Sequence, residues 1–373
     1  MRNVGMLDLE SENELFADEV RAAVEAVLDS RQYVNGPAVA EFEAKMAARF
    51  GIAHAIGVSS GTDAILCALM AAGIGPGDEV IVPTFTFFAT AGCVHRAGAT
   101  PVFVDIDPRT FNIDPARVAE AVTTKTRAII PVHLFGQCAE MDEINEIAAR
   151  GDLVVIEDAA QAIGATYKDR PACGLGLAGC LSFYPTKNLG GFGEGGMILT
   201  RDEAFAELCR RLRVHGESKR YVHERIGANF RMDTMKAAIL LVKLKYLNEF
   251  TTRRRNNAAK YDTLLDGAPV ERPLVRDYNA CVYHQYSILC ERRDELAAHL
   301  KEHGVGCGVY YPIPLHRQPC FGHLGADPDA FPNTDRVCER VLSLPVHPML
   351  TDDDLSYVAE CIHAFYGTHQ GMV

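Results

Sequence analysis

Short apolar runs that alternate with helical segments are the feature that most restricts the fold of this chain. Such runs occupy residues 54–58, 79–83, 101–105, 128–133 and 152–158. Segments with helical periodicity lie between them, for example 62–72, and 115–122 after a capping Asp114. Strands that alternate with helices form an α/β domain around a mostly parallel sheet. Because ligands bind beyond the carboxyl ends of such strands, functional residues are expected there.

The two ends of the chain show other patterns. Helices are predicted over about 14–28 and 39–50, and a long helix is predicted to begin at a capping Asp233. After about residue 255 the pattern indicates a strand at 284–290, a helix at 293–304, and a closing helix with a capping box of Thr351 and Asp354. The 373 residues are too many for one small domain. We therefore predict a large α/β domain over residues 1–250 and a smaller C-terminal α+β domain over residues 251–373.

The composition of the chain limits the kinds of binding partner and the cellular compartment that we expect. The chain has 37 basic and 49 acidic residues, a formal net charge of −12, which argues against nucleic acid as a partner. Its 12 cysteines form no CxxC pair and are expected to be reduced, buried thiols. We find no signal-peptide pattern and no apolar run of the roughly 18 residues that a membrane span needs. The prediction is a cytoplasmic protein without membrane contact.

Lys187 is the first candidate for chemistry. It follows a short strand that ends near Phe183. A partly desolvated lysine loses its proton near neutral pH and can form a Schiff base. The alternative is a surface lysine in a flexible loop. The loop after Lys187 can bend and be approached closely because it is rich in glycine: Gly190, Gly191, Gly193, Gly195 and Gly196.

Asp158 ends the predicted strand 152–158 and places a carboxylate at the carboxyl edge of the sheet. A carboxylate there can hold a proton on a pyridine nitrogen, which makes the ring an electron sink. Gln161 is positioned to donate to a phenolic oxygen of the same ring, and Phe87 to stack on it. The alternatives are a helix N-cap for Asp158 and a core position for Phe87.

A phosphate seat is predicted at Ser59-Ser60-Gly61-Thr62, between a strand and a helix. Free backbone N–H groups and the helix dipole favour an anion at such a turn. Ser182, five residues before Lys187, supplies a second hydroxyl. A simple Ser/Thr helix cap would leave the same sequence pattern.

Two other patterns carry no site. The run Gly174–Gly179 matches GxGxxG, but no strand precedes it and a strand rather than a helix follows. A dinucleotide site is therefore not expected. The histidines show no metal-ligand spacing such as HExxH, so no metal is predicted.

Five motifs occur together and in a fixed order: SSGTDA, PTFTFFAT, EDAAQAIGATY, SFYPTKNLGGFGEGG and GANFRMDTMKAAIL. Together they resemble the DegT/StrS family of nucleotide-sugar aminotransferases. The similarity runs from about Leu9 to Phe365. Each motif alone is weak, whereas the ordered set is specific.

The resemblance implies a fold-type-I architecture, pyridoxal 5'-phosphate as cofactor and a homodimer with shared active sites. It assigns Lys187 to the covalent bond with the cofactor and Asp158 to its pyridine nitrogen. It places Gln161 near the phenolic oxygen and Phe87 against the ring. The phosphate would be held by Gly61, Thr62, Ser182 and, from the partner subunit, Asn229.

The resemblance also implies the reaction. An amino acid, usually glutamate, would give its amino group to a keto group on a nucleotide-linked sugar, with Lys187 moving the proton. Relatives with His in place of this lysine perform dehydration, so a lysine favours transamination. The rival hypotheses are a pyridoxal-phosphate dehydratase or lyase and a non-catalytic, cofactor-binding regulator. At position 310, where many relatives have His, this chain has Tyr310, which puts the substrate-binding role of that position in doubt.

The substrate hypothesis depends on a basic segment. Residues 210–231 hold seven basic residues against Glu217 and Glu224: Arg210, Arg211, Arg213, Lys219, Arg220, Arg225 and Arg231. Such an excess suits a polyanionic ligand, and arginine grips carboxylate or diphosphate with two parallel hydrogen bonds. Some of these side chains are also expected to lie in water or to pair with acids.

The run 213–240 looks most like family members that aminate C3 of a UDP-linked 2-acetamido-3-keto-hexuronic acid. We therefore expect Arg231 or Arg225 to meet a sugar carboxylate. The alternative within the family is a neutral 3- or 4-keto-6-deoxy sugar on dTDP or UDP.

Overall fold

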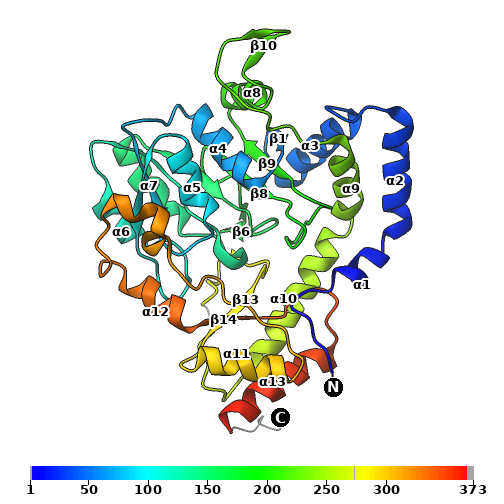
Figure 1. Ribbon diagram of the computed structural model, residues 1–373, viewed down its shortest axis with the longest axis vertical. Coiled ribbons are helices and arrows are strands. Elements are labelled where there is room, and N and C mark those ends of the chain that lie inside the picture. Colours follow the sequence, from blue (N-terminus) through cyan, green and yellow to red (C-terminus); the bar gives the residue numbers. More distant parts are fainter. Residues whose placement is uncertain (1, 273, 368–373) are drawn as a thin grey trace.

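A computed structural model describes residues 2–272 and 274–367. Its centre is a seven-stranded sheet in the order β1-β9-β8-β5-β4-β2-β3 (Figure 1). The strands are β1 (His54–Val58), β2 (Glu79–Pro83), β3 (Thr100–Val104), β4 (Thr126–Ile129), β5 (Val154–Asp158), β8 (Ala178–Ser182) and β9 (Gly196–Thr200). β9 pairs antiparallel with both of its neighbours, β1 and β8, and the other neighbouring strands of this sheet pair parallel. The prediction of an α/β fold with a mostly parallel sheet is confirmed.

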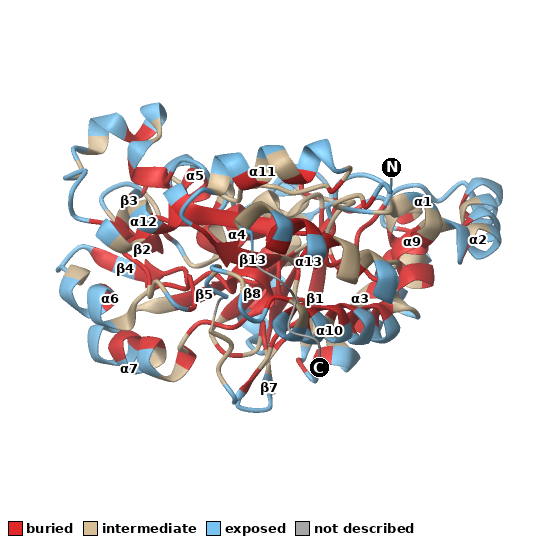
Figure 2. Cartoon of the chain, turned by 90° about the horizontal axis from the view of Figure 1, so that it is seen from below, coloured by how far each residue is buried: buried red, intermediate tan, exposed pale blue. Residues whose placement is uncertain are grey.

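Helices cover both faces of the sheet. They include α3 (Pro37–Phe50), α4 (Gly61–Ala71), α5 (Ala89–Arg96), α6 (Pro115–Ala121), α7 (Met141–Gly151) and α8 (Glu203–Leu212). Figure 2 shows buried residues in the strands and on the inner sides of these helices, with exposed residues on their outer sides. The central strands are apolar on both faces, as a sheet between two helical layers requires. Asp114 caps α6 through the Ala116 N–H at 2.9 Å, as predicted.

The N-terminal and central helices differ from their predicted bounds. The predicted helix at 14–28 is two helices, α1 (Leu9–Glu14) and α2 (Ala17–Ser30). The long helix predicted from Asp233 is also two, α9 (Thr234–Leu244) and α10 (Leu247–Leu264). At the break, the side chains of Lys245 and Tyr246 both donate hydrogen bonds to the Glu19 carboxylate of α2. Asp233 stands at the N-cap position, but its side chain pairs with Lys236 instead of capping the helix.

The C-terminal part packs around its own apolar cluster. It contains the antiparallel pair β13 (Tyr286–Leu289) and β14 (Val341–Leu344), and the helices α11 (Arg293–Glu302), α12 (Pro332–Arg340) and α13 (Asp352–Tyr366). The predicted capping box of Thr351 and Asp354 starts α13. Val4 joins this cluster from the N-terminal segment, and α10 runs through residue 250 without a break. A division at residue 250 therefore stays a prediction.

The remaining elements are short. Strands β6 (Thr166–Tyr167), β7 (Arg170–Pro171) and β12 (Asn279–Ala280) form a small sheet, and β10 (Glu217–Lys219) pairs with β11 (Val222–His223). Turns of 3-10 helix occupy η1 (Leu134–Gly136), η2 (Leu315–Arg317) and η3 (Pro319–Leu324). The β10–β11 hairpin projects from the body beside α8 (Figure 1). None of the described helices is long and apolar enough to cross a membrane.

Candidate active site

A cavity of about 680 Å³ lies at the carboxyl ends of β1, β2, β5 and β8. This is where parallel strands are expected to present a ligand site. Segments far apart in the sequence meet there because the sheet order brings these strand ends together. Its wall includes every sequence-predicted cofactor residue except Asn229, namely Gly61, Thr62, Phe87, Asp158, Gln161, Ser182 and Lys187.

Asp158 borders the cavity from the end of β5 and is 5% exposed. One carboxylate oxygen accepts a hydrogen bond from the Thr90 hydroxyl at 2.8 Å, and the other accepts from the Ala160 N–H at 3.2 Å. Burial raises the pKa of the Asp158 carboxyl, while these hydrogen bonds and the charge of Lys187 act in the opposite direction. A buried carboxylate of this kind is stabilised by a ligand that brings a proton.

Lys187 lies in the loop between β8 and β9 and faces the same cavity. Burial lowers the pKa of its amine to about 8, although the nearby Asp158 carboxylate acts to raise it. At pH 7 about a tenth of the amine is therefore unprotonated, far more than for a lysine of ordinary pKa, and this is the form that attacks a carbonyl. The surface-lysine alternative is wrong for this position.

Gln161 is held in one orientation. Its Oε1 accepts from the Phe135 N–H at 2.8 Å, so its Nε2 points the other way and donates to the Tyr311 hydroxyl at 3.0 Å. Tyr311 also borders the cavity, and its ring centre lies 6.2 Å from that of Phe87. Phe87 is 57% exposed, so the alternative of a core phenylalanine is wrong.

The predicted phosphate seat lies at the start of α4. Ser60 is the N-cap, and its hydroxyl accepts from the Asp63 N–H at 3.0 Å. Gly61 and Thr62 are the first two residues of α4, whose N–H groups have no partner within a helix. A Cβ on Gly61 would lie 2.7 Å from the Ser182 Cβ, so glycine lets Ser182 sit directly against the turn. The helix start thus combines a cap with an open anion site.

These features fit pyridoxal phosphate. An unprotonated amine suits its aldehyde, a buried carboxylate suits its protonated pyridine nitrogen, and a helix start suits its phosphate. The exposed Phe87 ring offers a flat surface in the same cavity. Three chemically distinct groups of one cofactor therefore find complementary side chains in one cavity.

The predicted substrate residues, together with the predicted phosphate ligand Asn229, divide into two groups. Tyr310 borders the cavity next to Tyr311. Asn229 and Arg225 are exposed, Arg231 is partly buried, and none of the three borders the cavity of its own chain.

Part of the basic segment is neutralised within the chain. Arg211 pairs with Glu207 at 3.0 Å and with Glu224 at 3.2 Å, and Arg210 lies 3.9 Å from Glu207. Arg213 pairs with Glu43 at 2.5 Å in a mostly buried position. Arg225 and Arg231 form no ion pair with any described residue. The excess positive charge of the segment thus lies within residues 217–231, which begin with the β10–β11 hairpin and are called the hairpin side below.

Backbone N–H groups in and next to the GxGxxG run bind a carboxylate of the chain itself. The buried Glu157 accepts hydrogen bonds from the N–H groups of Cys173, Leu175 and Gly176 at 2.7–2.8 Å. His133 lies 2.9 Å away through Nε2, while its Nδ1 accepts from the Ala139 N–H. Nε2 therefore carries the proton of a neutral ring and donates it to Glu157. This network anchors the strand that ends in Asp158.

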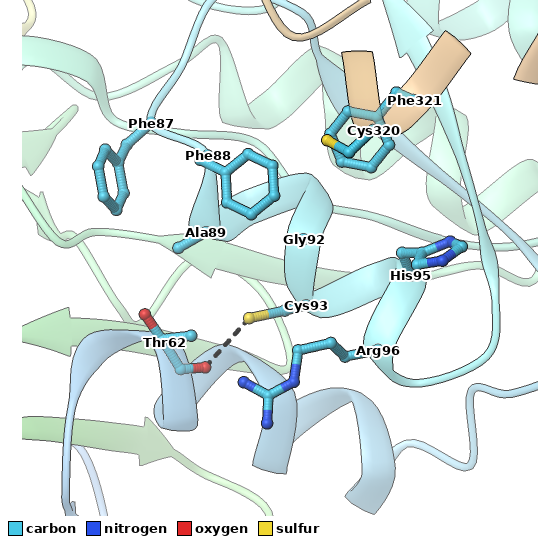
Figure 3. Close-up of a pocket in the computed structure, with 10 residues that line it drawn as sticks. All are labelled: Thr62, Phe87, Phe88, Ala89, Gly92, Cys93, His95, Arg96, Cys320 and Phe321. Carbon is cyan, nitrogen blue, oxygen red and sulfur yellow. Dashed lines mark hydrogen bonds between the residues drawn. The ribbon is translucent and has the colours of Figure 1, made fainter. Parts of the chain in front are cut away.

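A second hollow of about 370 Å³ adjoins the cavity and shares Thr62, Phe87 and Ala89 with it. Figure 3 shows the Phe88 and Phe321 rings on one side and the Arg96 guanidinium on another. The Cys93 thiol donates to the Thr62 carbonyl at 3.2 Å. Space for a ligand therefore continues past the cofactor residues.

Sequence reasoning missed several residues of the site. Thr90 lies within the PTFTFFAT motif, and Tyr311 follows Tyr310, but neither has a local pattern that reveals its partner. His284 and Glu194 also border the cavity. Within the described ranges, no group of three or more His, Cys, Asp or Glu side chains is arranged to hold a metal ion.

The cysteines are free thiols throughout the described chain. All are buried except Cys307, which is partly buried, and Cys320, which is exposed. Burial raises the pKa of thiols such as Cys93, to about 12, so these side chains are packing residues.

Several proteins resemble this chain over nearly its whole length. A "pleiotropic regulatory protein" of Geobacillus stearothermophilus is 51% identical, over 98% of this chain and 99% of its own. The UDP-2-acetamido-2-deoxy-3-oxo-D-glucuronate aminotransferase of Pseudomonas aeruginosa is 43% identical, over 96% and 99%. The dTDP-3-amino-3,4,6-trideoxy-alpha-D-glucose transaminase of Streptomyces venezuelae is 42% identical, over 93% and 92%.

Solved structures agree with the fold. The crystal structure of DesV from S. venezuelae, in complex with a ketimine intermediate, superposes with a TM-score of 0.96 at 40% identity over all of both chains. NtdA from Bacillus subtilis, with bound pyridoxamine phosphate, gives 0.91 at 32% identity over 99% of this chain and 86% of its own. The fold-type-I architecture is confirmed, and pyridoxal phosphate is confirmed as the cofactor type of these relatives.

The model of the DegT/DnrJ/EryC1/StrS aminotransferase family matches residues 15–363. That range includes every element that borders the cavity. Together with the full-length relatives, it establishes the assignment that the ordered motifs predicted. The chain belongs to the DegT/DnrJ/EryC1/StrS aminotransferase family.

Proposed function

We propose that the protein is a pyridoxal-phosphate aminotransferase that moves an amino group from an amino acid to a keto group of a nucleotide-linked sugar. The observation that carries this proposal is the meeting of Lys187 and Asp158 in one cavity beside the α4 anion seat. The transaminases named above support it at 42–43% identity over nearly the full chain. Glutamate is the proposed donor, and the amino sugar would serve a surface polysaccharide or a secondary metabolite.

When bound, pyridoxal phosphate supplies a carbonyl carbon that carries the amino group and a conjugated ring that takes up electron density. Asp158 holds the proton on the pyridine nitrogen, because its buried carboxylate is stabilised by that charge. Gln161, with Oε1 fixed by Phe135, donates one N–H of Nε2 to Tyr311 and has the other available for a ligand. The first turn of α4 and Ser182 bind the phosphate.

Lys187 moves the proton. Its unprotonated Nζ would take the proton from the α-carbon of the amino donor and deliver it to the cofactor. In the second half-reaction, with the keto-sugar, these proton transfers would run in reverse. A pKa of about 8 suits both directions, since Nζ must accept and release a proton at neutral pH. Tyr184 and Thr186, beside Lys187, narrow the cavity around it.

We propose that a second chain completes the substrate end of the site. We propose a homodimer in which Asn229 reaches the partner's phosphate seat and Arg225 or Arg231 meets the partner's substrate. The exposure of Asn229 and Arg225, away from their own cavity, supports this arrangement. The unpaired arginines favour an acidic sugar, as in the P. aeruginosa relative's UDP-linked uronate, over the neutral dTDP sugars.

The remaining space is consistent with a large substrate. The hollow that adjoins the cavity, with Phe88, Phe321 and Arg96 around it, extends the volume available beyond the cofactor residues. An amino-acid donor alone would not need this extension. We propose that the enzyme works in the cytoplasm, where its predominantly buried thiols stay reduced.

A substrate screen tests the proposal. The purified protein is incubated with glutamate and a panel of UDP- and dTDP-linked 3- and 4-keto sugars, and 2-oxoglutarate is measured. We expect 2-oxoglutarate to form in proportion to an amino sugar. A dehydratase would consume the sugar without forming 2-oxoglutarate. A non-catalytic regulator would consume neither sugar nor glutamate; the G. stearothermophilus relative is named as a regulatory protein.

A further inference from the structure

His284 is a buried histidine at the edge of the active-site cavity. It lies just before β13 in the C-terminal part of the chain and is 7% exposed. Its ring borders the same cavity as Lys187. No motif in the sequence pointed to it, and the reaction outlined above does not use it.

The neighbour of Lys187 determines the tautomer of this ring. Asn188 donates through Nδ2 to the Val282 carbonyl at 3.0 Å, so its Oδ1 faces the other way. That Oδ1 lies 3.1 Å from Nδ1 of His284 and can only accept. Nδ1 of His284 therefore carries a hydrogen.

The ring is also neutral. Burial, with the positive charges of Lys187 and Arg254 nearby, lowers the pKa of His284 well below its usual range. A neutral ring protonated on Nδ1 has its lone pair on Nε2. His284 thus offers a hydrogen-bond acceptor and no donor through Nε2.

Nε2 has no hydrogen-bond partner among the described residues, and the Nζ of Lys187 has none either. The buried polar atoms that are sealed from solvent without a partner do not include Nε2 of His284. Since the residue borders the cavity, Nε2 opens onto it. An unpartnered acceptor and an unpartnered amine thus share one cavity.

We propose that His284 is a positioning residue for Lys187: its Nε2 accepts a hydrogen bond from the lysine amine and so orients the amine's lone pair toward its reaction partner. No covalent bond changes at His284, and its ring stays neutral. Asn188, next to Lys187 in sequence, fixes the tautomer that makes this possible. The inference rests on the proposed function only in that Lys187 is the reacting amine.

Covalent capture of pyridoxal phosphate by cofactor-free protein tests this inference without any sugar substrate. Capture is followed by absorbance after rapid mixing, which gives the Kd of the initial complex and the rate constant of the covalent step. His284→Asn keeps an amide near the Nδ1 position but has no group at Nε2. His284→Gln places an amide oxygen near Nε2 but gives up the bond to Asn188.

We expect His284→Asn to slow the covalent step by about 10- to 100-fold at unchanged Kd, the scale of a misplaced reacting group. His284→Gln should recover most of that loss. His347→Asn is the control for removal of a buried imidazole, because His347 is 5% exposed and does not border the cavity. Its capture rate should match that of the wild type.

The opposite order, with His284→Gln slower than His284→Asn, would show that the ring acts only through Asn188 and would overturn the inference. Equal rates in both variants would overturn it too. If neither His284 variant folds, Asn188→Ala replaces them in the test. It removes the acceptor that fixes the tautomer of His284, so it should slow capture at unchanged Kd. In each of these cases wild-type capture leaves the proposed function standing, whereas absence of wild-type capture removes both.

Discussion

The cavity wall and the segment of residues 210–231 are both rich in polar groups, but they hold them differently. In the wall, Asp158 and Gln161 are each fixed by neighbours within the chain. In the segment, Arg213 is fixed by Glu43, while Arg225 is exposed without an ion pair among the described residues. The wall brings Lys187, Asp158 and Gln161 together within one chain. For the hairpin side of the segment, we propose that a second subunit supplies the partner.

This comparison predicts that substitutions in the cavity wall lower the rate of the reaction, and that substitutions on the hairpin side change subunit assembly or substrate choice.

The largest effect is expected at Lys187. Lys187→Ala should lower turnover by about 10⁴-fold, because it removes both the covalent attachment and the proton carrier. Glutamate-dependent 2-oxoglutarate formation measures the loss, with Lys168→Ala, an exposed lysine away from the cavity, as control. Turnover within tenfold of the wild type would place the reacting amine elsewhere.

Asp158→Asn should come next. The amide cannot stabilise a protonated pyridine nitrogen, so turnover should fall by about 10²–10³-fold, the scale of one lost preorganised electrostatic contact. Cofactor affinity should change little, because the phosphate seat on α4 is untouched. Equilibrium dialysis and steady-state kinetics separate the two quantities. A wild-type kcat in this variant would remove Asp158 from the mechanism.

Subunit mixing tests whether the hairpin side serves a partner. Lys187→Ala and Asn229→Ala proteins should each be nearly inactive, and co-refolded mixtures should recover about a quarter of wild-type activity, since half of the dimers are mixed and each has one complete site. The mixture of either variant with itself is the control. No recovery in verified heterodimers would show that Asn229 acts within its own chain or not at all.

Substrate choice should respond to the unpaired arginines. If Arg225 or Arg231 meets a sugar carboxylate, its replacement by alanine should lower kcat/KM for the acidic sugar by about 10- to 100-fold and leave the neutral counterpart nearly unchanged. Arg210→Ala is the matched control, because Arg210 lies beside Glu207. Equal losses for both sugars would mean that neither arginine recognises the carboxylate.

The smallest effect is expected at the phosphate seat. Gly61→Ala should weaken pyridoxal-phosphate binding by about tenfold, because the new Cβ would lie 2.7 Å from Ser182 Cβ and displace that side chain. Gly322→Ala is the control, since a Cβ there meets nothing within 4 Å. Unchanged affinity for Gly61→Ala would show that the contact between α4 and Ser182 is not part of the seat.

The predictable part of the site is the part with local causes. Asp158 ends an apolar run and Gly61 follows a strand, so strand periodicity alone placed both at the carboxyl edge of a parallel sheet. The loop of Lys187 was located by its glycines in the same way. These positions depend on repeating patterns within about ten residues, which a sequence shows directly.

Features with long-range causes were not predictable. No glycine or proline marks the break between α9 and α10, where Lys245 and Tyr246 contact the distant Glu19. His284 borders the cavity from the C-terminal part of the chain. Glu157 accepts hydrogen bonds from a loop whose sequence matches the dinucleotide-binding pattern GxGxxG. In each case the partner is distant in sequence, so no local pattern records the contact.

The central claim is that this cavity holds pyridoxal phosphate on Lys187, and borohydride reduction tests it most directly. The protein is loaded with the cofactor, reduced with borohydride, digested, and its modified peptide identified by mass spectrometry. We expect one cofactor per chain, on the peptide that contains Lys187, and no stable adduct in Lys187→Ala. A wild-type level of adduct in Lys187→Ala, or an adduct mapped to another lysine, would contradict the account.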